Sequence, residues 1–507
     1  LINFFLPLSK NINTFLLLIP CILILKNFKI YFNKKFFIFL FFSTLLIFVL
    51  ILESNVYRPD AGLYHLPYTK ILNDEKIIFG LSNFHFRYGH ISIVQYLSAI
   101  SNNLIFRENG IVFAQALIAA SVIINFSFKI YEYNKNKNYN FHFYFLISIL
   151  IFIIYKMNRY SEYGNDAPSH FLFFFLISEI ILLNKKNITD VCNCLIVILF
   201  VILNKITLLM CAFFALIILK KNIILDLFKL KRFYFLILFT FLWFSKNLIV
   251  SGCILYPVKS TCFESLIWTD LKIVKSVSNE NEAWTKDWPT YSKLLISKSD
   301  KISMENYSKK FFWVNYWLKG HFIKISKILI PYVTFLLLLS IYIKYCSSNV
   351  KITKEKKYFY LLIILIFSSL FWFIKVPVFR YGYSYLICLI ALIFAFANLK
   401  NHIKKNSIQK IFNVLLIFCF TIFFSKNILR IIKTDNDYNN YPWPKFYAMN
   451  EKNFPNGVEE IILKNKKLYK PNPNGYCMIS SSPCGNYGTK KNLDIIFHKN
   501  YLIMYLK

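Results

Sequence analysis

Long apolar runs alternate with short polar segments along most of this 507-residue chain. Runs of about 17 to 20 residues are long enough to cross a bilayer as helices. Helices are the expected form because lipid offers no water to hydrogen-bond an open backbone. We therefore predict an all-α polytopic membrane protein with about twelve transmembrane helices. The predicted spans are residues 12–25, 36–52, 110–128, 141–156, 169–183, 191–203, 206–219, 233–250, 323–343, 358–374, 382–398 and 409–425.

The polar segments between the runs differ in charge, and this difference predicts an orientation. Six segments are rich in basic residues, which is typical of cytoplasmic loops. They are residues 26–35, 129–140, 184–190, 220–232, 344–357 and 399–410. All six alternate correctly with the spans if they share one side. The other segments then face outward: the first outer loop 53–109, residues 157–168, a turn near 204, the large outer loop 251–322, residues 375–381 and the tail after 426.

This orientation predicts two domains. Residues 1–427 form a polytopic transmembrane domain, and residues 428–507 form a small extracytoplasmic tail domain. Much of the first outer loop is amphipathic and broken by glycine, which favours helices lying along the membrane surface. None of the twelve glycines falls in a predicted cytoplasmic loop. Tight turns and close approach of the backbone to a ligand are therefore expected on the outer side.

The formal net charge of +35 does not indicate nucleic-acid binding. The basic residues lie mainly in short loops between apolar runs, where membrane orientation requires them, so we expect no nucleic-acid partner. Lysine outnumbers arginine 53 to 7. In such a chain, a retained arginine favours a position that needs a planar, bidentate donor, although chance retention explains part of the set.

Two cysteine pairs lie in predicted outer segments. Cys253 and Cys262 flank a Tyr-Pro step in the large outer loop, and Cys477 and Cys484 are close together in the tail. Both pairs are compatible with disulfides in an oxidising compartment. The other seven cysteines lie in apolar spans or near the cytoplasm and are interpreted as small apolar filler. No cysteine or histidine cluster has zinc spacing.

The start of the first outer loop is dense in reactive groups. It reads Tyr57-Arg58-Pro59-Asp60-Ala61-Gly62-Leu63-Tyr64-His65-Leu66-Pro67. A carboxylate beside His and Tyr at a bilayer interface can act as a general base toward a hydroxyl, so Asp60 is the candidate base. The alternative is a helix N-cap. For His65, His85 and His90, interfacial hydrogen bonding is the favoured interpretation.

Two further outer segments add charged candidates. Asp166 comes directly before an apolar span and supplies either a second acid or a helix cap followed by proline. Arg380 lies between two spans among aromatic residues and could bind a phosphate of a lipid-borne substrate. Lys205 and Lys246 interrupt apolar stretches. Charges in spans suggest function, whereas snorkelling to the nearby interface suits both lysines.

The candidate site residues therefore come from several loops. Asp60 and Asp166 are the catalytic candidates. The substrate-binding candidates are Arg380, His65, Tyr64, Arg58, His85 and Arg87. We expect Asp60, Asp166 and Arg380 to converge on one outward-facing cavity.

Several segments resemble a family of uncharacterised bacterial multi-pass membrane proteins that carry a domain of unknown function. These segments are Asp60 to Pro67, Gly80 to Gly89, Ser251 to Pro257 and Cys477 to Cys484. The order of an apolar span, an outer loop with an early Asp, amphipathic loop helices, a second outer acid and a late Arg also resembles the GT-C superfamily of polyprenyl-phosphate-sugar glycosyltransferases.

The GT-C resemblance implies an inverting sugar transfer on the outer face of a bacterial inner membrane, in the assembly of cell-envelope glycans. Asp60 would be the base, Asp166 the second acid and Arg380 the phosphate ligand. The implied partners are the bilayer and a polyprenyl-phosphate-linked sugar, which is the donor. Many members carry paired acids in the first loop, whereas Asp60 follows a proline here. This departure leaves a role for a divalent cation open.

Two other functions fit the sequence. One is a transporter or flippase of a lipid-linked or amphiphilic solute, and the other is a non-catalytic component of envelope assembly. A transporter should place its charged residues mid-span at broken helices. Here the candidate groups lie in outer loops at span ends, which favours the enzyme, while the break at Lys205 keeps the transporter open.

Overall fold

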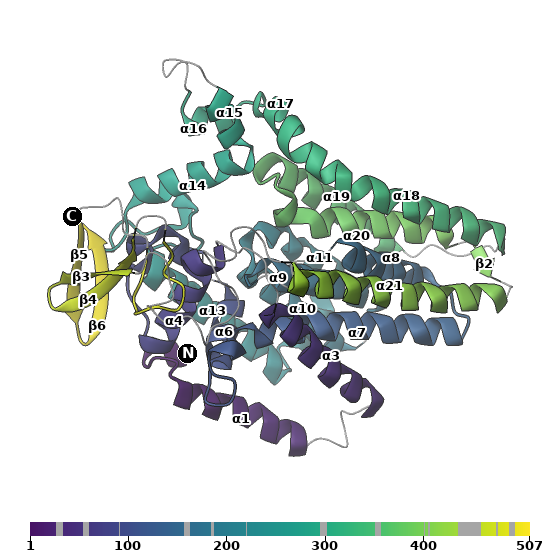
Figure 1. The fold of residues 1–507 in the computed structure, drawn as a ribbon, viewed down its shortest axis with the longest axis horizontal. Coiled ribbons are helices and arrows are strands. Elements are labelled where there is room, and N and C mark those ends of the chain that lie inside the picture. Colours follow the sequence, from purple (N-terminus) through teal and green to yellow (C-terminus); the bar gives the residue numbers. More distant parts are fainter. Residues whose placement is uncertain are drawn as a thin grey trace.

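The computed structural model describes fourteen segments of the chain. They are residues 1–26, 34–53, 60–90, 92–156, 163–183, 187–219, 221–294, 302–349, 356–399, 401–403, 406–433, 458–472, 475–485 and 492–507. Most of these residues are helical, and most of the long helices lie side by side in one bundle (Figure 1).

A helix covers each of the twelve predicted apolar stretches. These helices are α1 (Lys10–Lys26), α3 (Lys34–Leu52), α7 (Phe113–Lys135), α8 (Phe141–Lys156), α9 (Asp166–Leu182), α10 (Ile188–Asn204), η6 (Ile206–Phe213) with α11 (Phe214–Ile218), α13 (Lys231–Ser251), α18 (Ile323–Tyr345), α19 (Lys356–Lys375), α20 (Phe379–Asn398) and α21 (Asn406–Ile432). Within the described residues, seven helical stretches are long and apolar enough to cross a membrane. The chain is thus a helical protein with membrane-spanning character, and the number twelve stays a prediction.

Helix α8 forms the centre of the bundle. Every residue from Phe141 to Ile154 is buried, as expected of a helix that is apolar on all sides. Helices α7, α20 and α21 pack around it. The outer helices instead expose large apolar side chains, including Phe41 of α3, Phe241 of α13 and Ile417 of α21. Such exposure suits contact with lipid rather than water.

The two ends of the bundle carry different elements (Figure 1). At one end, the short strands β1 (Ser347–Asn349) and β2 (Asn401–Ile403) pair antiparallel, with Ser347 opposite Ile403. Both strands belong to loops with predicted cytoplasmic orientation, so these two loops do share a side. The segments predicted to face outward gather at the opposite end.

Short helices from the first and the large outer loops cover that opposite end. The first loop contains η2 (Ala61–His65), α4 (Leu66–Asp74), α5 (Leu81–Phe84), η3 (Phe86–Gly89), α6 (Ile93–Ser101) and η4 (Glu108–Val112). The large loop contains η7 (Lys259–Thr261), α14 (Leu271–Thr285), α15 (Trp288–Leu294), α16 (Met304–Lys309), α17 (Trp313–Trp317) and η9 (Leu318–Phe322). Elsewhere lie η1 (Ile2–Phe4) and α12 (Lys221–Leu227). Helix α14 is amphipathic: it buries Val274 and Val277 and exposes Lys272.

The tail contains β-structure, so the expectation of an all-α protein holds for the bundle apart from the short β1–β2 pair, but not for the tail. Strands β3 (Val458–Leu463) and β4 (Lys466–Pro471) form one antiparallel hairpin. Strands β5 (Leu493–His498) and β6 (Tyr501–Leu506) form a second. Alternating burial along β6, with Leu502 and Met504 inside, is the period-two pattern of a strand.

The tail packs on the first outer loop. The Phe79 N–H donates to the Leu502 carbonyl at 2.9 Å, and the Met504 N–H donates to the Phe79 carbonyl at 2.9 Å. Lys466 and Glu75 form an ion pair at 2.5 Å. The tail disulfide joins Cys477 and Cys484, and a second disulfide joins Cys253 and Cys262 in the large outer loop. The tail therefore covers the loop that carries Asp60.

Candidate functional site

Asp60 and Arg380 form an ion pair that joins the first outer loop to the start of α20. Arg380 Nη1 lies 3.2 Å from Asp60 Oδ2, across 320 residues of sequence. Asp60 occupies the N-cap position of η2, but its side chain makes no capping hydrogen bond. Of the two interpretations of Asp60 from sequence, capping is therefore not what its carboxylate does.

Asp166 and Lys205 form a second pair beside the first. Asp166 lies in the first turn of α9, and the Lys205 ammonium contacts its Oδ1. The Lys205 side chain is 5% exposed, so it does not snorkel to the interface as the sequence suggested. A buried ammonium is costly unless an anion neutralises it. The break between α10 and η6 places Lys205 where Asp166 can do this.

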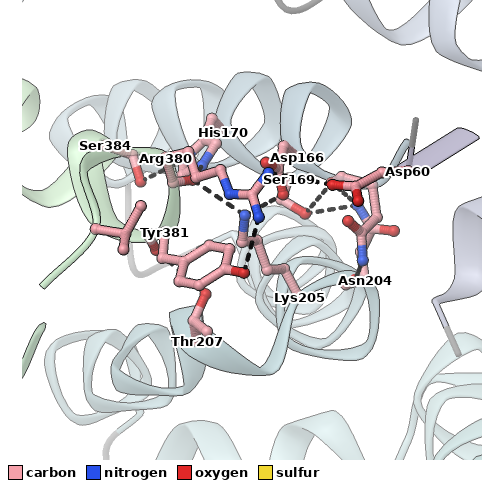
Figure 2. Close-up of polar contacts among 12 residues, drawn as sticks. Asp60, Asp166, Ser169, His170, Asn204, Lys205, Thr207, Arg380, Tyr381 and Ser384 are labelled. Atoms are coloured by element: carbon pink, nitrogen blue, oxygen red, sulfur yellow. Dashed lines mark hydrogen bonds and ion pairs between the residues drawn. The ribbon is translucent and has the colours of Figure 1, made fainter. Parts of the chain in front are cut away.

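The backbone of Arg380 is held by residues from two other helices (Figure 2). Its carbonyl oxygen accepts from Lys205 Nζ at 3.0 Å and lies 2.9 Å from His170 Nε2. The other nitrogen of His170, Nδ1, lies 2.9 Å from Ser384 Oγ. Thr207 Oγ1 donates to the carbonyl of Tyr381 at 3.2 Å. These contacts fix the backbone of the first turn of α20, and the Arg380 guanidinium extends from this turn toward Asp60.

Asparagine side chains join α9 to the end of α10. Asn204 Nδ2 donates to the Asn165 carbonyl at 3.0 Å and to Ser169 Oγ at 2.6 Å. In return, Asn165 Nδ2 donates to the Asn204 carbonyl at 3.1 Å. Val94 N–H lies 3.4 Å from Asn204 Oδ1, which ties in α6 of the first loop. These contacts position Asp166, at the start of α9, against Lys205, directly after α10.

His65 lies in the same region as a neutral hydrogen-bonding group. Its Nδ1 lies 3.2 Å from Gln95 Nε2. Burial lowers the pKa of His65 to about 4, against the opposing effect of the nearby Asp60 and Asp166 carboxylates. The ring is therefore uncharged near neutral pH. It can orient a polar group but cannot neutralise a phosphate.

Tyr64 and Arg87 extend the site along the first loop. The Arg87 guanidinium lies 4.9 Å from the centroid of the Tyr64 ring. Burial, followed by the charge of Asp60, raises the pKa of Tyr64 well above its usual value, while Arg87 and Arg380 oppose the rise. Tyr64 thus lies near enough to both arginines and to Asp60 to feel their charges, and its hydroxyl stays protonated.

Of the remaining two loop candidates, His85 does not join this cluster. His85 accepts a hydrogen bond from the Arg87 N–H at Nδ1, 3.1 Å away, and its ring lies 5.0 Å from that of Tyr88. Tyr88 donates to the Cys484 carbonyl, so His85 belongs to the contact between loop and tail. Burial lowers the pKa of His85 to about 3. Arg58 lies outside the described residues.

Trp284 brings the large outer loop to the site. It lies in the last turn of α14, and the Arg380 guanidinium is 5.4 Å from the centroid of its indole. The neighbouring Ala283 and Thr285 are buried, whereas Trp284 is 44% exposed. An exposed indole beside a cation offers a flat surface for a ring or a sugar face.

The exposure of the four charges decides what the site can do. Asp60 is the most accessible side chain at 40%, followed by Arg380 at 24% and Asp166 at 18%, while Lys205 is nearly buried. An accessible carboxylate can take a proton from a hydroxyl. A guanidinium has five N–H donors; Nη1 contacts Asp60 and Nη2 contacts the Tyr381 hydroxyl at 3.2 Å. Donors are therefore left for an anionic ligand.

A metal site does not emerge from the described residues. Among them, no group of three His, Cys, Asp or Glu side chains could hold a metal ion. The two candidate acids each face a side-chain cation, Arg380 for Asp60 and Lys205 for Asp166.

The sequence did not predict the residues that surround the Asp60–Arg380 pair. His170 and Trp284 carried no signal, because a histidine in an apolar span and an exposed tryptophan are common. Lys205 did carry one, since it is a charge beside Asn204 in the middle of an apolar stretch. Its partner was not predictable, because Asp166 and Lys205 are 39 residues apart.

Comparison with known proteins identifies the family. A family model described as "Domain of unknown function (DUF8201)" matches residues 1–387, which is most of the chain. The match includes Asp60, Asp166, Lys205 and Arg380, while the tail lies beyond it. No curated protein and no solved structure matches the chain. The protein therefore belongs to the DUF8201 family.

Proposed function

We propose that this protein is a GT-C-like membrane glycosyltransferase. It would transfer a sugar from a polyprenyl-phosphate-linked donor to an acceptor hydroxyl, in the assembly or modification of cell-envelope glycan. The observation that carries the proposal is the ion pair between Asp60 and Arg380. It sets an accessible carboxylate, a guanidinium that could bind a phosphate and the exposed indole of Trp284 side by side at one end of an apolar bundle.

In the proposed reaction, the Asp60 carboxylate accepts the proton of the acceptor hydroxyl. The acceptor oxygen forms a bond to the anomeric carbon from the face opposite the leaving group, so the configuration inverts. The bond between that carbon and the phosphate oxygen breaks, and the lipid phosphate leaves with the electron pair. Arg380 stabilises the negative charge that grows on the phosphate, which is the kind of electrostatic assistance that lowers such barriers most.

Asp166 has a supporting part in this proposal. The sequence predicted it as a second catalytic acid, and its contact with Lys205 suggests how it would act. Lys205 also donates to the Arg380 carbonyl at 3.0 Å. Asp166 would then hold Lys205, and through it the first turn of α20, rather than touch the substrate.

The finer features of the fold belong to the same proposal. About twelve spans would place the site on the outer face of a bacterial inner membrane, where lipid-linked sugars are used. The basic residues of the loops at the β1–β2 end support this orientation. The steps above use no divalent cation.

A transporter of an amphiphilic solute is the second candidate. It is favoured by the helix break that follows α10, where Lys205 pairs with Asp166 and Leu208 departs from helical geometry. Broken helices with buried charges are typical of transporter sites. Asp60 and Arg380 are more accessible than that pair and lie at the ends of their elements, which favours transfer chemistry.

The test is the Asp60→Asn variant in cells that lack the native chain. It keeps the size of the side chain but removes the base, and we expect at least about a 100-fold loss of transfer, the usual effect of losing a general base. The measurement is the amount of surface glycan together with the accumulation of the lipid-linked sugar. The level of the variant in the membrane is measured in parallel.

Asp74→Asn is the matched control. Asp74 is on the same loop, its side chain is 37% exposed, and it pairs with Lys70 at 3.1 Å. It should leave the glycan unchanged. An Asp60→Asn protein that is present at the normal level and makes normal glycan would contradict the proposed mechanism. If the Asp60→Asn protein makes normal glycan and the cells still take up an amphiphilic solute, the transporter is favoured.

A further inference from the structure

Arg87 carries a positive charge that no acid neutralises among the described residues. It is half-buried and lies on η3 in the first outer loop. Its guanidinium lies 4.9 Å from the centroid of the Tyr64 ring and 5.2 Å from that of Phe86. Within the part of the chain that the structure describes, its side chain forms no ion pair and no hydrogen bond. Its N–H donors are therefore available to a ligand.

The other two cations of the candidate site differ from Arg87 in this respect. Arg380 pairs with Asp60 at 3.2 Å, and Lys205 contacts Asp166. These two pairs cancel, so Arg87 leaves the site with an excess positive charge. In a partly buried site such a charge attracts an anion more strongly than in bulk water, because the effective dielectric constant is lower. The excess charge therefore favours an anionic ligand.

Arg87 also lies close to the residues around Asp60. Tyr64 is four residues after Asp60, and its ring contacts the Arg87 guanidinium. Burial is the main cause of the shifted pKa values of Tyr64 and His65, and the charges of Asp60 and Arg87 then act on both groups in opposite directions. The candidate base and the unneutralised cation thus act on the same two side chains.

The backbone that carries Arg87 is fixed from three sides. His85 Nδ1 accepts from the Arg87 N–H at 3.1 Å. Tyr88 is buried, and its hydroxyl donates to a backbone carbonyl of the tail. His90 Nε2 lies 3.3 Å from Asn281 Nδ2 of α14. Little ordering of this segment is therefore needed when a ligand binds, which favours affinity.

The two rings also suit Arg87 to one kind of ligand. Arginine stacks on aromatic faces, and this leaves the N–H groups at the edge of its plane free to donate. Those groups form a fork that matches a carboxylate or a phosphate with two parallel hydrogen bonds. A neutral hydroxyl uses only part of this fork and gains nothing from the charge.

We propose that Arg87 binds an anionic group, a carboxylate or a phosphate, on the acceptor. This inference rests on the proposed function, in which the acceptor presents its hydroxyl to Asp60 and the donor phosphate binds Arg380. Because the configuration inverts, the acceptor and the leaving phosphate lie on opposite sides of the anomeric carbon. Arg87 comes from the first outer loop, as Asp60 does, whereas Arg380 comes from α20. The acceptor is therefore an acidic sugar or polyol rather than a neutral one.

The test measures the binding of small acceptor mimics to the purified full chain in detergent, with no donor present. The probes are glucuronate, glucose 6-phosphate, glucose and inorganic phosphate, each titrated by isothermal calorimetry. We expect at least one of the two sugar anions to bind about tenfold more tightly than glucose, because it adds a hydrogen bond between charged groups. The tighter of the two identifies the anionic group. Inorganic phosphate should bind more weakly than glucose 6-phosphate, because it lacks the sugar hydroxyls.

The variants separate a ligand site from a structural role. Arg87→Gln should bind the preferred sugar anion about tenfold more weakly and glucose as the wild type does. Unchanged glucose binding and melting temperature show that this variant is folded. Arg87→Lys keeps the charge and should retain part of the preference for the anion. Arg107→Gln, the same change at an exposed arginine of the same loop, should bind every probe like the wild type.

Four results would overturn the inference. They are wild-type binding of both sugar anions no tighter than glucose, unchanged anion binding by Arg87→Gln, an equal loss in Arg107→Gln, and inorganic phosphate binding as tightly as glucose 6-phosphate. The last result would mean a general anion site rather than an acceptor site. None of these measurements requires transfer. An active Asp60→Asn protein would thus contradict the proposed mechanism alone, and the probe titrations test Arg87 alone.

Discussion

At the scale of single residues, the arrangement of charges is what sets this site apart. Arg380 contacts Asp60 through its side chain, and its carbonyl accepts from Lys205, which in turn contacts Asp166. The four formal charges cancel. Each buried charge can therefore persist only while its partner is present, because removing one member of such a pair leaves the other uncompensated.

Lys205→Met tests this dependence. The change leaves Asp166, which is 18% exposed, without its cation, and we expect the free energy of unfolding to fall by roughly 2 kcal/mol, below the full cost for deeply buried pairs. Thermal unfolding in detergent measures the loss. The double variant Lys205→Met/Asp166→Leu should recover part of it, since contacting residues show non-additive effects.

The surface pair Lys229–Asp226 provides the comparison for that experiment. Its side chains are 77% and 51% exposed, so Lys229→Met should cost less than about 1 kcal/mol. If Lys205→Met unfolded no more easily than Lys229→Met, the buried pair would not hold the site together.

At the scale of elements, the contact between the first outer loop and the tail gives Asp60 its surroundings. Gly80 lies between α4 and α5 with φ +64°, and a Cβ built on it would lie 2.1 Å from the Met504 carbonyl oxygen of β6. The Met478 N–H donates to the Gly62 carbonyl at 2.9 Å, two residues from Asp60. Glycine at position 80 is therefore required both by its backbone conformation and by the approach of a strand.

Gly80→Ala should loosen the tail. The added methyl group meets backbone that cannot rotate away, so we expect a loss of about 1 to 3 kcal/mol in stability and faster proteolytic cleavage within β5 and β6. Limited proteolysis of the full chain in detergent measures this. Asn500→Gly, in the exposed turn of the same hairpin with φ +65°, should leave the cleavage rate unchanged. If the tail of Gly80→Ala resists cleavage as well as the wild-type tail, the contact between Gly80 and β6 is dispensable.

At the scale of the whole molecule, the bundle has two unlike ends (Figure 1). One end carries the β1–β2 pair within lysine-rich loops, and the other carries the outer-loop helices, the tail and the candidate site. Lysine-rich loops favour the cytoplasm. The site should therefore face away from the cytoplasm.

Single cysteines at the two ends test the orientation. Lys272→Cys is at the start of α14, Lys356→Cys is at the start of α19, and both lysines are exposed. In a Cys21→Ser background, a thiol reagent that cannot cross membranes should label Lys272→Cys in intact cells, and Lys356→Cys only after permeabilisation. The reverse pattern of labelling would mean that the protein has the opposite orientation in the membrane. Labelling of both cysteines in intact cells would contradict the assignment of the spans.

The helices could be predicted from the sequence, and the basic loops could be separated from the other segments. Runs such as residues 141–156 are apolar on every face, and in lipid such a run can satisfy its backbone only as a helix. These are local properties, so they can be read without knowing the fold. The same holds for the candidates Asp60, Asp166 and Arg380, which stand out as charges at the ends of apolar runs.

Which of these residues meet depends on the tertiary structure. The Asp60–Arg380 contact spans 320 residues, the Asp166–Lys205 pair depends on where α10 ends, and the tail took up β-hairpins that pack on the first loop. Such contacts follow from how helices pack, and no local pattern encodes them. The difference is plainest for the two lysines interpreted as snorkelling: Lys205 contacts the Asp166 carboxylate, whereas Lys246 is buried with its ammonium over the face of Trp243.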